Sequence, residues 1–385
     1  MKRIGILYFG IAVAILSVVA FSCKKSATPA NNNNNNNGNV NQDSVLLNIG
    51  NNIILPSYQN YAIAINSLDS SIGDFNQGPT STKLSNVQTL FKNAYIAWQS
   101  VSEYNQFGPA SINIPPVSGL NLFPASTTVI NNNISAIGTT TININSFANQ
   151  TAKGFPALDY LLFGTDNVTL LTDFTTDANA ANRKQYLALV STDIKTETSA
   201  TVTAWSATGG NYINTFITSS GNSVSSSLGL LLNSLDQDLE ILKNYRLGAP
   251  LGLVFTTTTS PTQVEAYYSG ISAQLALTQL KAIQNIYLGS GTYGNGLGLR
   301  NYLITSKAVY STYTGASLDS TIKSELALDI TDLEAVPDPL SATIQTSPAV
   351  ATDAFNKTQQ LVVLLKTDMP SLLGVAITYG DNDGD

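Results

Sequence analysis

Residues 83–101 read KLSNVQTLFKNAYIAWQSV, and the spacing of apolar side chains in this stretch decides the fold class. Apolar residues recur at alternating intervals of three and four positions, which matches one face of an α-helix. These residues are Leu84, Val87, Phe91, Ala94, Trp98 and Val101. The pattern predicts a helix over 83–106 that Gly108 and Pro109 bring to an end.

The same spacing recurs later in the chain. Residues 224–247 and 264–286 each carry an apolar stripe of helical period. The first stripe has Arg246 in its last turn and Gly248 after it, which is typical of a helix C-terminus. Shorter candidate helices lie at 46–66, 181–205, 319–334 and 350–367. Strand-like alternation is confined to short pieces such as 138–147, which we assign to loops or helix ends, so we expect an all-α protein built of helix bundles.

A faint internal duplication accompanies the helical pattern. Three pairs of segments look alike, and they follow the same order in both halves of the chain. The pairs are 94–108 with 275–289, 154–161 with 296–303, and 239–243 with 361–366. Ordered parallels of this kind indicate two copies of one helical unit. We place the join at 256–261, which divides the body into an N-terminal bundle domain, 46–255, and a C-terminal bundle domain, 256–385.

The first residues follow the pattern of an export signal. A basic start precedes an apolar run over 4–21, and the run closes with Ser22 and Cys23. A small residue before a cysteine at this place is typical of a bacterial lipoprotein that is cleaved and acylated. The alternative is an uncleaved transmembrane anchor, because the run is nearly long enough to cross a bilayer. We predict a lipoprotein signal peptide at 1–22 and a lipid anchor on Cys23.

The segment that follows the anchor has little apolar surface to bury. Residues 31–37 are all asparagine, so we expect 23–45 to be a disordered tether. Cys23 is the single cysteine of the chain, so acylation leaves the mature protein without a thiol or a disulfide. The predicted location is the cell envelope, with the lipid anchor in the outer membrane, on its periplasmic or its surface face. The membrane is therefore one expected partner.

Composition excludes several classes of function. The net charge is −7 and no basic stripe is present, so we expect no nucleic-acid partner. The chain contains no histidine, which excludes Ser-His-Asp triads and zinc sites built on imidazole. Oxygen ligands remain, and they suit a divalent metal such as calcium, magnesium or manganese, or ferric iron.

Four segments, taken in order, resemble one protein family. They are 94–98 with 107–110, then 154–164, 243–248 and 373–385. The resemblance is to the imelysin family, also called imelysin-like or iron-regulated protein A-like proteins, over roughly residues 46–385. It implies an all-α fold of two related up-down four-helix-bundle domains, on a protein outside the inner membrane. It also implies a metallopeptidase annotation and a link to iron uptake.

The hallmark of that family is a Gly-x-His-x-x-Glu motif at a site between the two domains. In this chain the corresponding segment begins at Gly154 and reads GFPALD. The histidine position is Pro156, which has no ligand atom on its side chain. The glutamate position is Asp159, which keeps a carboxylate on a shorter arm. A peptidase mechanism that depends on the motif histidine is therefore not available to this chain, and we assign no catalytic residue.

Three charged residues are candidates for a pocket at this site. Asp159 lies within an apolar run, and it either faces an interdomain pocket or braces a neighbouring helix. Glu103 either faces the same pocket or is a solvated residue at the rim of its helix. Arg246 either pairs with Asp159 or a bound carboxylate, or compensates the dipole of its helix. Asp159 and Glu103 are also the candidate ligands of any metal.

Three functions stay open at this point. The favoured one is a non-catalytic binding protein with an interdomain pocket for a small ligand or peptide, acting in iron or nutrient acquisition. The iron link rests on the resemblance alone. The second is a metal-dependent peptidase that uses oxygen ligands. The third is a structural or interaction protein of the envelope, suggested by a surface rich in Asn, Ser and Thr.

Overall fold

The computed structural model describes residues 40–104, 107–109, 119–306 and 314–378. The predicted signal peptide, Cys23, most of the tether and the last residues of the chain lie outside the described residues. Helices dominate the described part, where the strands are β1 (Ser290–Gly291) and β2 (Gly294–Asn295), an antiparallel pair of two residues each. The prediction of an all-α protein is confirmed.

The first helix is longer than predicted at both ends. It runs through α1 (Gln42–Asn48), the π-helical η1 (Ile49–Ile54) and α2 (Leu55–Gln77) without a break. The Asn41 side chain accepts a hydrogen bond from the Ser44 N–H (2.9 Å), which caps the start of the helix. The helix therefore begins inside the segment predicted to be tether.

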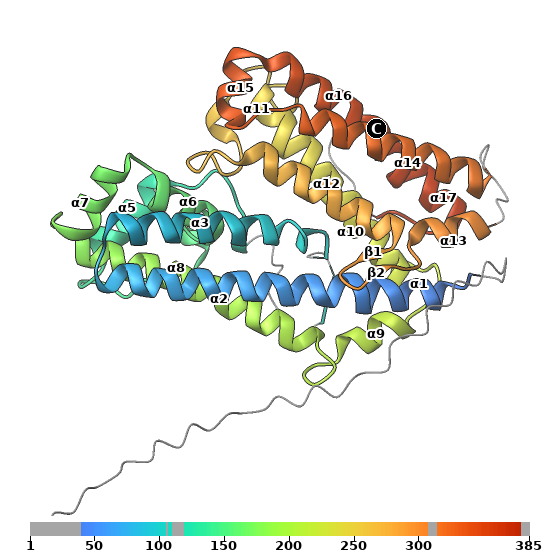
Figure 1. Ribbon diagram of the computed structural model, residues 1–385, viewed down its shortest axis with the longest axis horizontal. Coiled ribbons are helices and arrows are strands. Elements are labelled where there is room, and N and C mark those ends of the chain that lie inside the picture. Colours follow the sequence, from blue (N-terminus) through green and yellow to red (C-terminus); the bar gives the residue numbers. More distant parts are fainter. Residues whose placement is uncertain (1–39, 105–106, 110–118, 307–313, 379–385) are drawn as a thin grey trace, which may run out of the picture. The chain divides into compact units, whose positions relative to one another are not determined.

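The helices that follow in the chain pack around α2. Figure 1 shows α3 (Ser81–Trp98) and α8 (Ala180–Trp205) lying along α2, and each of them packs against α2 over much of its length. Shorter helices complete this bundle, and they are α5 (Thr127–Ala136), α6 (Gly154–Phe163), α7 (Asn167–Thr175) and α9 (Tyr212–Thr218). The predicted helix at 181–205 is confirmed by α8.

The C-terminal part forms a second group of helices, in which α14 packs against α12 and α16 (Figure 1). Its helices are α10 (Ser227–Glu240), η4 (Ile241–Gly248), α11 (Ala249–Leu251), α12 (Ser272–Leu288), α13 (Leu299–Thr305), α14 (Gly315–Glu334), α15 (Leu340–Thr346), α16 (Pro348–Val363), η6 (Leu364–Asp368) and α17 (Met369–Leu373). Of these, η4 and η6 are π-helical. Elsewhere in the described residues, short 3₁₀ helices are η2 (Ser102–Tyr104), η3 (Phe147–Ala152) and η5 (Pro261–Gln263).

Two further helix boundaries differ from the prediction, each because the backbone turns where the apolar pattern continues. The helix predicted over 83–106 ends at Trp98, after which the Val101 N–H bonds to the Trp98 carbonyl and 3₁₀ turns follow. The helix predicted to start at Val264 starts at Ser272. Before it lies an irregular segment in which Ala266 has a φ of 51° and Gly270 a φ of 67°. The segment 138–147 is irregular, as predicted.

Two helices of the chain end in the same way, which agrees with the predicted duplication. After α10 the chain passes through a π-helical segment, a short helix with proline at its start, and Gly252 in the left-handed region. After α16 the same order ends at Gly374, also left-handed. The Leu253 N–H bonds to the Gly248 carbonyl, and the Val375 N–H bonds to the Pro370 carbonyl (both 2.9 Å). The division at 256–261 stays a prediction.

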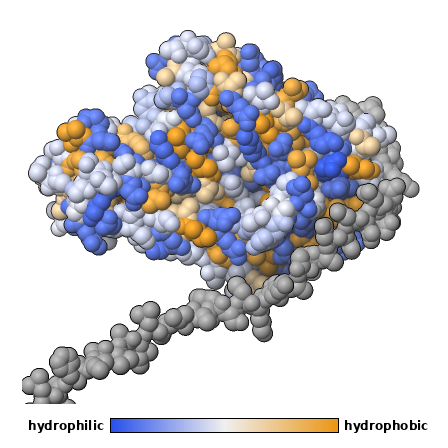
Figure 2. All heavy atoms as spheres, in the orientation of Figure 1, coloured by the Kyte–Doolittle hydropathy of each residue, from blue (hydrophilic) through white to orange (hydrophobic). Residues whose placement is uncertain are grey.

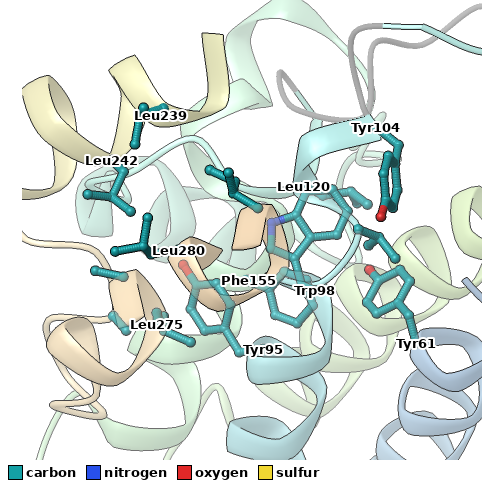
Figure 3. Packing of buried hydrophobic residues seen from close by; sticks show 14 of the residues in the cluster. Tyr61, Tyr95, Trp98, Tyr104, Leu120, Phe155, Leu239, Leu242, Leu275 and Leu280 are labelled. Atoms are coloured by element: carbon teal, nitrogen blue, oxygen red, sulfur yellow. The ribbon is translucent and has the colours of Figure 1, made fainter. Parts of the chain in front are cut away.

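The apolar core is continuous across that predicted division. Phe155 lies at its centre, with the ring of Tyr95 stacked on it at 4.5 Å between centroids (Figure 3). Other aromatic rings close around Phe155, and they are Tyr61, Phe91 and Trp98. Figure 3 shows the core continuing toward Leu275 and Leu280 of α12. A second buried tryptophan, Trp205, packs among the rings at the end of α8.

The surface is mixed in character. Figure 2 shows hydrophobic residues scattered among hydrophilic ones over the visible face. Isolated apolar side chains such as Phe147, which is 87% exposed, are normal on folded proteins. Within the part of the chain that the structure describes, no helix combines the length and hydrophobicity that a membrane span requires.

Truncation of Phe155 should destabilise the protein far more than the same change at an exposed site. We expect Phe155→Ala to lower the free energy of unfolding by about 3–5 kcal/mol, because it leaves a cavity among four aromatic rings. Phe147→Ala is the matched control and should change it by less than about 0.5 kcal/mol. Urea unfolding followed by circular dichroism measures both values. Equal losses would show that Phe155 is not central to the core.

Candidate functional site

The motif segment forms helix α6, and Gly154 sets its start. Gly154 has a φ of 70°, in the left-handed region that glycine adopts without strain. A β-carbon at this position would overlap the carbonyl oxygen of Leu120. Glycine is therefore required both by backbone conformation and by the close approach of the segment that carries Leu120. This contact fixes the direction in which α6 enters the core.

Pro156 lies in the first turn of α6, where a helix tolerates proline because the N–H of that turn has no helical partner. It is buried, and it lines a cavity of about 250 Å³ together with Asp159. We call this space the motif cavity. Its lining residues are Phe123, Pro124, Ala125, Thr127, Pro156, Asp159, Thr262, Gln263, Val264, Ala266, Tyr267 and Tyr268. The walls therefore come from both sides of the predicted join at 256–261.

Asp159 holds the irregular segment in front of α12. Its Oδ2 accepts the Tyr268 N–H (2.8 Å) and its Oδ1 accepts the Ser269 N–H (2.9 Å). Only 2% of the residue is exposed. Burial raises the pKa of Asp159 to about 6, although these hydrogen bonds oppose the shift. The structure thus shows the bracing role, played on a loop rather than on a helix, and Asp159 also lines the motif cavity.

Arg246 does not pair with Asp159. Its Nη1 contacts Glu265 Oε2 (3.1 Å) and donates to Gln99 Oε1 (2.5 Å). Glu265 Oε1 in turn accepts Gln99 Nε2 (2.9 Å) and Asn121 Nδ2 (2.7 Å). All four residues are buried, and we call them the buried polar network. The network joins α3, η4 and the loop before α12 through charge-assisted hydrogen bonds.

Sequence reasoning missed Glu265, the main partner of Arg246. The residue falls within the stripe over 264–286 that was predicted to be helical. The sequence does contain a signal for a buried acid here, because Glu265 stands between the apolar residues Val264 and Ala266. The π-helical η4 also contributes, because it turns Arg246 inward at 3% exposure while the preceding Tyr245 is 47% exposed.

Glu103 lies in a different cavity from Asp159, so the prediction of one shared pocket is wrong. The premature end of α3 places Glu103 in η2 beside α10 and α12. There it lines a cavity of about 310 Å³, the hairpin cavity, together with Lys281 and Ser290. The residue is fully buried rather than solvated at a rim. Burial, together with the charge of Asp238, raises the pKa of Glu103 well above its ordinary value.

The motif residues do not fit the metal that the family's peptidase annotation implies. Pro156 offers no ligand atom, and both carboxylate oxygens of Asp159 already accept backbone N–H groups. Within the described residues, no group of three or more His, Cys, Asp or Glu side chains converges in a way that could hold a metal ion. Asp159 and Glu103, the two candidate ligands, line separate cavities.

The stability that Asp159 contributes should depend on pH. Its pKa in the folded protein, about 6, lies above the ordinary value of 3.8, so the folded state binds the proton more tightly. The resulting stabilisation is full below about pH 4 and is lost as pH rises through about 6. The difference in free energy of unfolding between wild type and Asp159→Asn should therefore shrink by about 2–3 kcal/mol between about pH 4 and pH 7.

Urea unfolding at several pH values between these limits measures that difference. The matched control is Asp353→Asn, because Asp353 is exposed on α16. Its difference from wild type should stay nearly constant. A pH-independent difference for Asp159→Asn would contradict the assignment.

Comparison with known proteins agrees with this fold. A protein-family model described as imelysin, peptidase M75, matches residues 54–367. A structure from Parabacteroides distasonis ATCC 8503, named as an iron-regulated protein A precursor, superposes with a TM-score of 0.68 at 16% identity, over 86% of this chain and 94% of that one. An imelysin-like protein from Psychrobacter arcticus 273-4 gives 0.60 at 18% identity, over 88% and 96%.

No curated protein sequence matches the chain. The two structural neighbours show the shared fold, and the family model covers most of the chain. The match includes the motif helix α6, the buried polar network, the motif cavity and the lining of the hairpin cavity except Ile53. This chain belongs to the imelysin family.

Proposed function

We propose that this chain is a lipid-anchored protein of the cell envelope that binds a small ligand in the motif cavity and does not cleave peptides. One observation carries the proposal. The carboxylate that the family motif would present to a metal instead holds the Tyr268 and Ser269 amides, so it shapes a wall of the cavity. Pro156, in the histidine position, adds an apolar surface to the same cavity.

The lining of the motif cavity suits a small organic ligand. Phe123, Tyr267 and Tyr268 supply aromatic surface, and Gln263 and Thr127 supply a few polar groups. Small-molecule sites are commonly built in this way, from apolar walls with a few polar groups. The proposed role in iron or nutrient acquisition rests on the family and on the name of the Parabacteroides neighbour. The proposed address rests on the export signal and Cys23.

Lipid anchoring has a direct test. Cys23→Ser should prevent acylation, so the protein should move from the membrane fraction to the soluble fraction and take up no labelled palmitate. Ser22→Ala keeps a small residue before the cysteine and should leave both properties unchanged. A Cys23→Ser protein that stays in the membrane fraction would favour the uncleaved transmembrane anchor.

To distinguish ligand binding from peptidase activity, both are measured on the same preparation of the protein. We expect no cleavage of casein in the presence of zinc, manganese or ferric citrate beyond the level seen with a chelator. Native mass spectrometry of protein isolated from its own envelope should show a co-purifying small molecule. Gln263→Trp should remove it, because the indole fills the cavity from an exposed lining position.

Gln77→Trp is the matched control, since Gln77 is exposed at the end of α2 and should leave the bound molecule in place. Chelator-sensitive cleavage that disappears in Asp159→Ala would establish a metal-dependent peptidase instead. A bound molecule that survives Gln263→Trp would place binding outside the motif cavity. If neither a ligand nor cleavage is found, the protein acts as a structural or interaction protein.

A further inference from the structure

The hairpin cavity has walls that are built by specific side chains. The β1–β2 hairpin forms one wall, and Asn52 holds it by accepting the Tyr293 N–H (2.6 Å) and donating to the Gly294 carbonyl (2.8 Å). Asn48 donates to the Gly289 carbonyl (3.1 Å) at the base of the hairpin. Both asparagines lie at the π-helical part of the first helix, so this wall is fixed to a long helix.

Glu103 is the unusual group of this cavity. The residue is fully buried, and among the described residues no donor lies at ordinary hydrogen-bond distance and geometry from its two carboxylate oxygens, although the nearby Ser102 side chain opposes the rise in its pKa. Its position is nevertheless fixed, because Ser234 of α10 donates to the Glu103 carbonyl oxygen (2.6 Å). A buried polar group without a partner costs free energy, so such a group in a native protein calls for an explanation.

The surroundings of Glu103 carry an excess of acid. Asp238 lies close enough to raise the pKa of Glu103, and Ser102 bridges toward Asp238 at 3.4 Å. Arg246 faces these carboxylates, but its ion pair is made with Glu265 at 3.1 Å. A cation that enters the cavity would therefore favour the ionised form of Glu103 and would attract it strongly at the low dielectric of this buried site.

A positive charge, that of Lys281, lines the cavity at a more exposed position than Glu103. Lys281 of α12 lines the cavity, its side chain is 45% exposed, and its Nζ contacts Glu334 at 2.7 Å. An ammonium group has three donors, so Lys281 can bind a further anion while it keeps Glu334. Hydroxyl and amide groups also line the cavity, and they belong to Ser57, Ser100, Thr278, Asn285 and Ser290.

We propose that the hairpin cavity binds a small zwitterion of the amino-acid class, with its ammonium group at Glu103 and its carboxylate at Lys281. The cavity volume of about 310 Å³ equals roughly ten water molecules at about 30 Å³ each, which is too large for a bare ion. Lys281 disfavours ligands that carry a second positive charge. Glu103 is the single carboxylate in the lining, which argues against a divalent metal.

Binding should be linked to proton release. Without a ligand, burial favours the neutral form of Glu103, whereas a bound ammonium favours the carboxylate. The other titratable or charged groups that face Glu103 are Asp238, Arg246, Tyr58 and Tyr104, with Lys281 in the same cavity. Protonated amine that binds at about pH 7 should therefore displace the proton of Glu103, and the measured enthalpy should vary with the ionisation enthalpy of the buffer.

Three probes with one carbon skeleton test the proposal by calorimetry on the full lipidated chain in detergent. They are 4-aminobutyrate, butylamine and butyrate. We expect 4-aminobutyrate to bind most tightly and butyrate to bind least. Glu103→Gln should weaken binding of 4-aminobutyrate by at least about tenfold and abolish the proton release. Lys281→Gln should lower the affinity for 4-aminobutyrate to that for butylamine. The affinity for butylamine itself should stay the same or rise.

Glu103→Gln should fold, because it keeps the shape of the side chain and removes a buried acid that Asp238 repels. Should it unfold, Thr278→Trp gives a second test, since the indole fills the cavity from α12. Asp74→Asn, at an exposed site on α2, is the matched control and should leave all three affinities unchanged. Equal affinities for the three probes, no binding of 4-aminobutyrate, or full binding by Glu103→Gln would each overturn the proposal. The motif cavity plays no part in these outcomes.

Discussion

The two hydrogen bonds from backbone amides to the Asp159 carboxylate are the interaction on which the rest of the site depends. They tie helix α6 to the irregular segment before α12, and this segment supplies one wall of the motif cavity. The same bonds occupy both oxygens of the one acid that the motif retains. A group that could have served a metal thus stabilises a loop. Hydrogen bonding offsets part of the cost of burying the carboxylate, and its raised pKa reports the remainder.

The buried polar network extends this connection between the two parts of the chain. Arg246 and Glu265 form an ion pair out of contact with solvent, and Gln99 bonds to both of them. Removal of one charge from such a pair leaves the other buried without a partner, which is strongly destabilising. The π-helical η4 brings Arg246 to this place, in keeping with the frequent occurrence of π-helical turns at functional sites. Arg246 makes its ion pair with Glu265, so Glu103 has no ion-pair partner of its own among the described residues. The specificity that we propose for the hairpin cavity rests on this feature.

Helical periodicity was enough to predict the class of the fold and most of the long helices. The stripe from Leu84 to Trp98 forms α3, and the prediction over 181–205 agrees with α8. The pattern could not show that α3 ends at Trp98, because the next apolar residues are buried from a 3₁₀ turn instead. Nor could it show the loop before α12, since Glu265, Tyr268 and Ser269 are held by partners more than a hundred residues away. Long-range contacts of this kind leave no periodic trace.

The burial of both tryptophans in one part of the chain has a practical consequence for spectroscopy. Trp98 and Trp205 are the two tryptophans of the sequence, and both lie among aromatic rings around α2 and α8. The helices from α12 onward carry tyrosine and phenylalanine but no tryptophan. Indole emission therefore reports solvent entry into the first bundle only, whereas the amide signal in the far ultraviolet sums over all helices. A mismatch between the two melting profiles would reveal that the halves of the molecule come apart in separate steps.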